Sequence, residues 1–118
     1  PVTTADRNAA LQAVQAWAQA WSQQDVRSYL GAYSNRFDPG GGLSLDTWKQ
    51  QRRARLTAPT SITVQVLNPV ATALSNDAVR VRFVQIYQSN SYADQTLKEI
   101  DLVREDGGWR ILREVLAP

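Results

Sequence analysis

Hydrophobic residues in the first half of the chain recur at the spacing of α-helices. Within residues 11–21 they lie three or four positions apart, which places them on one face of a helix. The spacing restarts over residues 26–33 after Asp25, a residue type that caps helices, and a third helix is expected between Ser44 and Pro59. The pattern therefore predicts three helices. The loop before the third helix contains Asp38-Pro39-Gly40-Gly41-Gly42.

The second half alternates hydrophobic and polar residues, which is the period of β-strands. Such runs cover residues 62–66, 70–74, 78–88, 92–105 and 109–116. Asn68-Pro69 separates the first two runs, so two short strands are expected there. Asp106-Gly107-Gly108 is a tight-hairpin signal before the last strand. Helices followed by meandering strands predict an α+β domain, with a helical layer packed on an antiparallel sheet.

Composition excludes several kinds of chemistry. The 118 residues suit one domain with one hydrophobic core. The chain has no cysteine and no histidine, which excludes thiolate metal sites, cysteine nucleophiles and a Ser-His triad. The net charge of +2 is too small to indicate a nucleic-acid partner. No metal and no cofactor are expected. No transmembrane segment is expected either, since no apolar run approaches the ~20 residues that span a bilayer.

The chain begins with Pro1 and contains no methionine. We therefore expect residues 1–118 to form a single domain cut from a longer protein, or a chain whose leader has been removed.

Several stretches of the sequence carry a family resemblance. They are residues 16–22 with 25–30, 48–53, 83–89, 94–98 and 109–114. With the order of the elements, they resemble the NTF2-like superfamily, a cone-shaped α+β fold whose N-terminal helices pack on a curved antiparallel sheet. More narrowly, they resemble the NTF2-like domain at the C-terminus of L,D-transpeptidase and carboxypeptidase-type cell-shape proteins, and of some tetratricopeptide-repeat proteins of Gram-negative bacteria.

The resemblance, which covers about residues 8–116, implies a location and a parent protein. It implies the periplasm or cell envelope, and parent-chain domains that supply catalysis or a scaffold. It does not imply transpeptidase activity, because that chemistry needs a cysteine and a histidine that this chain lacks. A fold shared by isomerases, dehydratases, transport factors and inert domains does not name a reaction.

Aromatic and polar residues predict a ligand pocket inside the cone. Gln85 interrupts an otherwise apolar strand face, and Lys98 lies on a face with hydrophobic neighbours. A polar group buried without a partner costs about 2 kcal/mol or more, so each needs one. The partners are expected to be a Lys98–Glu114 contact and a Gln85–tyrosine contact, or a ligand. The candidate pocket residues are Tyr29, Tyr33, Trp48, Gln85, Tyr87, Lys98 and Glu114.

The third predicted helix carries the densest group of basic residues. Lys49, Arg52 and Arg53 lie at spacings of three and four, which places them on one helix face, with Arg55 nearby. Such a face can meet an anionic glycan, a lipid head group or a peptide carboxylate. The alternative is a solvated helix face without a partner.

These observations favour a non-catalytic accessory domain in the bacterial cell envelope. It is expected to bind a small molecule, a glycan or peptide ligand, or a protein partner, as part of a peptidoglycan-modifying or scaffold protein. A homodimer through the outer sheet face is also expected, since Val84 and Ile86 supply apolar area there.

Two alternatives remain. One is an isomerase or cyclase-type enzyme that uses a carboxylate of raised pKa with a phenol donor. Its candidate residues are Asp38, Asp101 and Glu114, with Tyr29, Tyr33 and Tyr87. Against it, Asp38 fits a turn before Pro39, and Asp101 and Glu114 fit salt bridges with arginines. The other alternative is a structural or dimerisation domain whose cone is filled by its own side chains.

Overall fold

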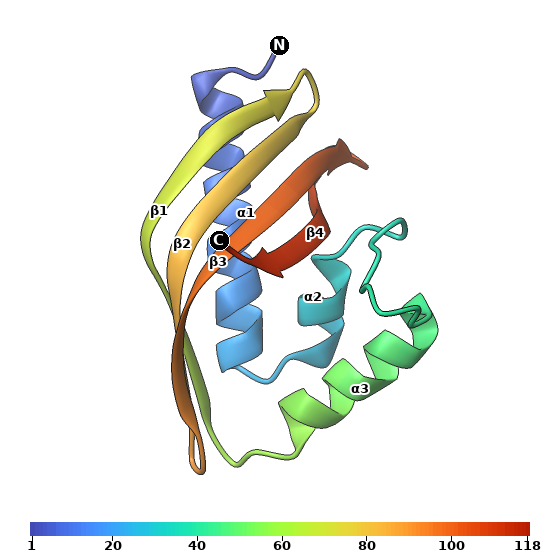
Figure 1. The fold of residues 1–118 in the computed structure, drawn as a ribbon, viewed down its shortest axis with the longest axis vertical. Coiled ribbons are helices and arrows are strands. Elements are labelled where there is room, and N and C mark those ends of the chain that lie inside the picture. The colour runs from blue at the N-terminus through green and yellow to red at the C-terminus, as the bar shows by residue number, and fades with distance from the viewer.

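The computed structural model describes residues 1–118 as three helices followed by four strands (Figure 1). The helices are α1 (Thr4–Ser22), α2 (Val26–Gly31) and α3 (Leu45–Thr57). The strands are β1 (Ile62–Ser75), β2 (Ala78–Ser89), β3 (Ala93–Glu105) and β4 (Gly108–Leu116), paired in the order β1-β2-β3-β4 with every pair antiparallel. The long strands curve, α1 lies across one face of the sheet, and α2 and α3 lie to one side of it. The predicted α+β cone is confirmed.

The helix starts follow from capping residues. At the start of α1, the Thr3 hydroxyl accepts a hydrogen bond from the Asp6 backbone N–H at 3.1 Å, and the Asp6 carboxylate accepts one from the Thr3 N–H at 2.9 Å. Asp25 and Ser44 cap α2 and α3 as predicted. These side chains satisfy backbone donors that have no partner within the helix.

The second helix is shorter than its hydrophobic spacing predicts. It ends at Gly31, and Tyr33 forms a parallel bridge with Ile111 of β4 instead of a further helical turn. The Ile111 N–H donates to the Ala32 carbonyl and the Ser34 N–H donates to the Ile111 carbonyl, both at 2.8 Å. Tertiary hydrogen bonds to β4 thus replace helical ones and bring Tyr33 against the sheet.

The first strand is continuous, so the prediction of two short strands separated at Asn68-Pro69 is wrong. The register with β2 shifts between Leu67 and Val70, and Asn68 adopts a left-handed φ of 51°. Because β1 is an edge strand, a proline there need not remove a ladder hydrogen bond, and the irregularity is absorbed as a bulge.

A bulge in β4 overturns the simple alternation predicted for that strand. The pattern predicted Ile111 and Glu114 on opposite faces. The register with β3 shifts between Asp101 and Leu102, which leaves Leu112 as an extra residue. A one-residue insertion reverses the faces of all later residues. Glu114 therefore lies on the inner face with Ile111.

Aromatic side chains fill the deep interior of the cone. Trp17, Tyr29 and Phe83 are at most 1% exposed. The Trp17 ring centroid lies 6.1 Å from that of Phe83 and 6.4 Å from that of Tyr29. Aliphatic residues of α1 and the sheet complete this core, among them Val14, Val79, Val81, Ile100 and Leu102. No open cavity is left at the centre of the fold, so any ligand site lies nearer the surface.

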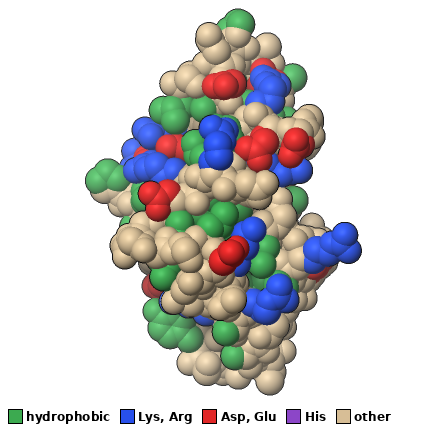
Figure 2. Space-filling model, turned by 90° about the vertical axis from the view of Figure 1, so that its right-hand side faces the viewer, with side chains coloured by type: hydrophobic (Ala, Val, Ile, Leu, Met, Phe, Trp, Pro, Cys, Tyr) green, Lys and Arg blue, Asp and Glu red, His purple; other side chains and the backbone are tan.

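The surface carries a mixture of side chains. Figure 2 shows the side of the molecule on which α3 lies in Figure 1, with basic, acidic and hydrophobic groups interspersed. Charge of one sign therefore does not dominate this face. None of the three helices combines the length and apolarity that crossing a bilayer requires.

Candidate functional site

A pocket of about 320 Å³ lies between α3 and the inner face of β2 and β3. We call it the mouth pocket. It is lined by Trp21, Arg52, Arg55, Gln85, Tyr87, Tyr92, Asp94, Thr96, Lys98 and Leu116. It shares Arg52, Lys98 and Leu116 with a smaller hollow of about 210 Å³ that reaches Trp48 and Glu114. Aromatic rings, cations, carboxylates and neutral polar groups therefore meet at one opening.

Gln85 is the lining residue that the protein itself leaves unsatisfied. It is 7% exposed, and its Oε1 atom has no hydrogen-bond partner. The predicted contact between Gln85 and a tyrosine is therefore not formed by Oε1. A buried acceptor without a partner costs about 1–3 kcal/mol, and most such groups in native proteins are satisfied. Oε1 itself is buried, so the donor group of a ligand reaches it when the Gln85 amide turns toward the pocket that the residue lines.

Lys98 and Glu114 form the predicted cross-strand contact. Lys98 Nζ donates to Glu114 Oε2 at 2.7 Å, and the two side chains are 10% and 6% exposed. Lys98 Nζ also lies 5.6 Å from the Trp17 ring centroid and 5.7 Å from that of Trp21. The contact depends on the β4 bulge, which turns Glu114 inward. The lysine is thus fixed by a carboxylate and by the electron-rich faces of two indoles.

The other oxygen of Glu114 connects to a chain of buried hydroxyls. The Tyr33 hydroxyl donates to Glu114 Oε1 and accepts from Trp17 Nε1 at 2.9 Å. The Tyr29 hydroxyl lies 3.2 Å from that of Tyr33. A phenol carries one proton, and the carboxylate is the stronger acceptor, so Tyr29 supplies the proton for this last contact. Both carboxylate oxygens are therefore occupied by protein donors.

The pKa values in this network follow from burial and charge. Burial alone would raise the pKa of Glu114, but the charge and hydrogen bond of Lys98, with the Tyr33 hydroxyl, outweigh it and hold that pKa below its ordinary value. Burial, and then the negative charge of Glu114, raises the pKa of both Tyr29 and Tyr33. At neutral pH the carboxylate is charged and both phenols keep their protons.

Glu114 differs from the carboxylate that the isomerase alternative predicts. That mechanism needs a carboxylate of raised pKa, and the pKa of Glu114 is lowered. Asp38 accepts from the Gly40 N–H at 2.8 Å, which is the turn contact predicted for it. Asp101 pairs with arginines on the outer sheet face, as predicted. The predicted arginine salt bridge of Glu114 is wrong, since its partner is Lys98.

The structure separates the predicted pocket residues into lining and supporting groups. Gln85, Tyr87 and Lys98 line the mouth pocket, and Glu114 and Trp48 line the hollow beside it. Tyr29 and Tyr33 are 0% and 5% exposed and lie behind Glu114, and Tyr33 also borders a separate hollow against α2 and α3. The sequence did not predict Trp21, Tyr92, Asp94, Thr96 and Leu116 as lining residues. The helical spacing of Trp21 predicted a core residue, and its side chain both packs in the core and lines the pocket.

The predicted single basic face on α3 is divided by packing. At 100° per residue, Arg52 lies between the buried residues Trp48 and Leu56, and its guanidinium is 5.4 Å from the Trp48 ring centroid. Arg52 and Arg55 line the mouth pocket, whereas Lys49 and Arg53 line a different hollow. Helical spacing places residues on the helix surface but does not say where neighbouring elements divide that surface.

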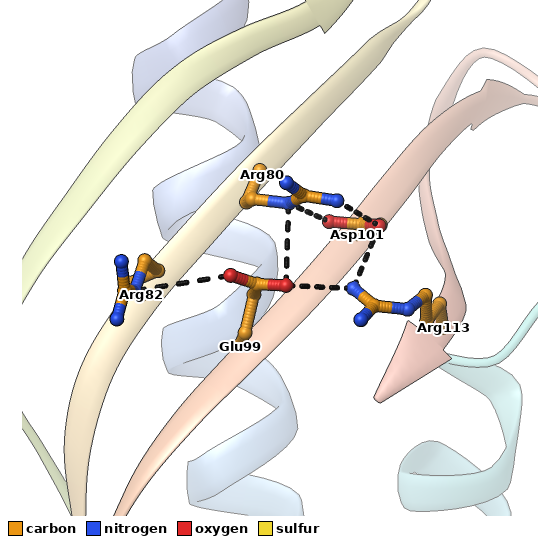
Figure 3. Close-up of polar contacts among 5 residues, drawn as sticks. All are labelled: Arg80, Arg82, Glu99, Asp101 and Arg113. Carbon is orange, nitrogen blue, oxygen red and sulfur yellow. Dashed lines mark hydrogen bonds and ion pairs between the residues drawn. The ribbon is translucent and has the colours of Figure 1, made fainter. Parts of the chain in front are cut away.

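The outer face of the sheet carries a separate ionic cluster, which we call the outer ladder (Figure 3). Its members are Arg80, Arg82, Glu99, Asp101 and Arg113. Arg80 Nε lies 2.8 Å from Asp101 Oδ1, and Arg113 Nη1 lies 2.7 Å from Glu99 Oε2. The cluster lies across the sheet from α1 and does not border the mouth pocket. No group of three or more carboxylates is positioned to hold a metal ion.

Comparisons with known proteins identify relatives. The family model described as the Cds6 C-terminal NTF2-like domain matches residues 9–115. Bd1075 from Bdellovibrio bacteriovorus is 26% identical with a TM-score of 0.83, over 97% of this chain and 41% of that one. The helical cell shape determining protein Pgp2 from Campylobacter jejuni is 18% identical with a TM-score of 0.79, over 96% of this chain and 42% of that one.

An NTF2-like protein of unknown function from Pseudomonas putida is also similar. It is 14% identical with a TM-score of 0.79, over 97% of this chain and 87% of that one. No curated protein sequence matches the chain. The predicted membership of the NTF2-like superfamily is confirmed. The chain spans about two fifths of the length of Bd1075 and Pgp2.

Proposed function

Because the chain belongs to the family of Cds6 C-terminal NTF2-like domains, we propose that it is a non-catalytic accessory domain that binds a ligand in the bacterial cell envelope. Residues 1–118 would form one domain of a longer protein that modifies peptidoglycan or scaffolds such enzymes. The similarity to Pgp2, a helical cell shape determining protein, supports the envelope location. The periplasm is the compartment in which such a domain meets peptidoglycan.

The observation that carries the proposal is the unpartnered Oε1 of Gln85 on the wall of the mouth pocket. Its ligand must present an N–H or O–H donor that meets this atom when the Gln85 amide turns toward the pocket. Trp21 and Tyr87 offer flat apolar surfaces to a sugar ring or a methyl group. Arg52 and Arg55 offer charge to a carboxylate. Glycan–peptide fragments of peptidoglycan carry all three kinds of group.

The test is calorimetric titration with soluble glycan–peptide fragments of peptidoglycan. Gln85→Met keeps the length of the side chain and removes the acceptor, so we expect the affinity to fall about tenfold or more. Gln88→Met is the matched control, since Gln88 is exposed and belongs to the same strand. We expect it to bind as the unaltered chain does.

A stability measurement separates loss of the acceptor from loss of the fold. With no ligand present, Gln85→Met should raise the free energy of unfolding by about 1 kcal/mol, because a buried unsatisfied acceptor is removed. Urea unfolding measures this change. No binding by the unaltered chain, or equal affinity of Gln85→Met and Gln88→Met, would contradict the proposal. The proposal would also be contradicted if the pocket bound a protein partner and no glycan–peptide fragment.

A second candidate function, dimerisation, is favoured by apolar residues on the outer sheet face. Leu67, Val84 and Leu97 lie opposite one another on β1, β2 and β3, and Leu67 and Leu97 are 40% and 42% exposed. The outer ladder beside them presents both charge signs, which a second copy related by a twofold axis can match. Sedimentation equilibrium should detect a dimer that Val84→Lys disrupts. A monomer at high concentration would remove this candidate.

A further inference from the structure

Away from the mouth pocket and its neighbouring hollow, a further hollow of about 520 Å³ lies against α2, α3 and the β3–β4 hairpin. Four basic residues from three elements line it. They are Arg27 of α2, Lys49 and Arg53 of α3, and Arg110 of β4. We call this hollow the basic cleft. It shares no lining residue with the mouth pocket.

The four cations have no carboxylate partner of their own. None of them takes part in an ion pair, whereas Lys98 and five arginines elsewhere do. Two carboxylates, Glu105 and Asp106, also line the cleft. Glu105 is engaged elsewhere, since Oε2 lies 3.7 Å from Arg36 and accepts from the Ser34 hydroxyl at 2.8 Å. Four basic and two acidic residues leave an excess of two positive charges in the lining.

Convergence distinguishes this cluster from an ordinary solvated helix face. Arg27, the Lys49–Arg53 pair and Arg110 are far apart in the sequence, and the fold brings them to one concave surface. Val26 and Leu30 are half-buried and contribute apolar walls beside these charges. Four cations face two carboxylates in this lining, so repulsion among the cations is only partly offset, and an anion bound among them would reduce it further.

We propose that the basic cleft binds a compact group with two negative charges. Arginine guanidinium groups present paired N–H donors that match phosphate and carboxylate oxygens, and Lys49 adds a point charge. A phosphate ester and a dicarboxylate share this chemistry. The site is independent of the mouth pocket, so its existence does not rest on the proposed function.

The experiment measures thermal unfolding of the unaltered chain in inorganic phosphate, in succinate and in sodium chloride at matched ionic strength. An anion that binds the folded state raises Tm with its concentration. Calorimetry then gives the dissociation constant of the anion that stabilises. We expect Arg53→Gln, and separately Lys49→Gln, to weaken that binding about tenfold, as the loss of one charge-assisted hydrogen bond does.

Arg7→Gln is the control, since it removes the same charge at a residue of α1 that does not line the cleft. Stabilisation by phosphate beyond sodium chloride that Arg53→Gln weakens and Arg7→Gln keeps assigns a phosphate ester, and the same pattern with succinate assigns a dicarboxylate. Equal Tm values in all three salts, or equal weakening in Arg7→Gln, would overturn the proposal. Gln85→Met should leave the anion effect intact, which separates this site from the mouth pocket.

Discussion

The sheet carries two ionic clusters, one on each face, and β3 contributes to both. Alternation along β3 points Lys98 inward and Glu99 and Asp101 outward. The inner carboxylate, Glu114, has a single cation within 4 Å, Lys98, and hydrogen-bonded tyrosine behind it. In the outer ladder Glu99 meets three arginines and Asp101 meets two (Figure 3). The two clusters therefore differ in redundancy.

They also differ in access to water. The Lys98 and Glu114 side chains are 10% and 6% exposed, so a charge left alone there stays buried. The outer carboxylates are 8% exposed, but Arg80, Arg82 and Arg113 are between 34% and 47% exposed. An outer arginine that loses a partner can turn its charge to solvent. The inner pair should thus be sensitive to single changes, and the outer ladder tolerant of them.

The largest effect is expected from Lys98→Met. This change leaves the Glu114 carboxylate buried without its close cation, which in other buried pairs costs about 3–5 kcal/mol. Urea unfolding at neutral pH measures the loss. The double variant Lys98→Met with Glu114→Gln should recover part of it, because the neutral amide can still accept from Tyr33. A loss below about 1 kcal/mol for Lys98→Met would mean that the inner pair is as tolerant as a surface pair.

The acid dependence of stability sharpens the same contrast. The pKa of Glu114 is lower in the folded protein than its ordinary value. Its contribution is therefore fully present above the unfolded-state pKa of about 4.3, and is lost as pH falls through the lower folded-state pKa. We expect Tm to fall less steeply below about pH 4.3 in the double variant than in the unaltered chain. Parallel curves from pH 6 to pH 2.5 would assign the acid sensitivity to other groups.

Local sequence signals were sufficient for much of the fold. The caps at Asp25 and Ser44, and the Asp106-Gly107 turn with φ values of 54° and 76°, each depend on a few adjacent residues. The Lys98–Glu114 contact was also predictable. Its prediction required only that one cation and one carboxylate lie on adjacent strands. The alternation predicted for β4 did not place Glu114 on the same face as Ile111.

Other features depend on tertiary structure that periodicity does not contain. The bulge at Leu112 is a matter of register with β3, and nothing in the β4 sequence marks it. The missing partner of Gln85 depends on where the tyrosines lie after packing. The basic cleft joins Arg27 to Arg110, which no spacing rule connects. The strand alternation predicted a pocket lined by aromatic and polar residues, but the fold determined which of them line it.

The smallest effect is expected from Glu99→Gln in the outer ladder. Arg80 and Arg113 keep Asp101, and Arg82 turns to water, so the loss should be about 1 kcal/mol or less. Because the arginines are partly exposed, the loss should shrink further between 0.1 and about 0.5 M salt, where the Debye length shortens. Lys98→Met is the comparison, since a buried pair is screened far less. Glu99→Gln could instead cost as much stability as Lys98→Met and depend as little on salt. Burial of the carboxylates, rather than exposure of their arginine partners, would then determine the stability that each cluster contributes.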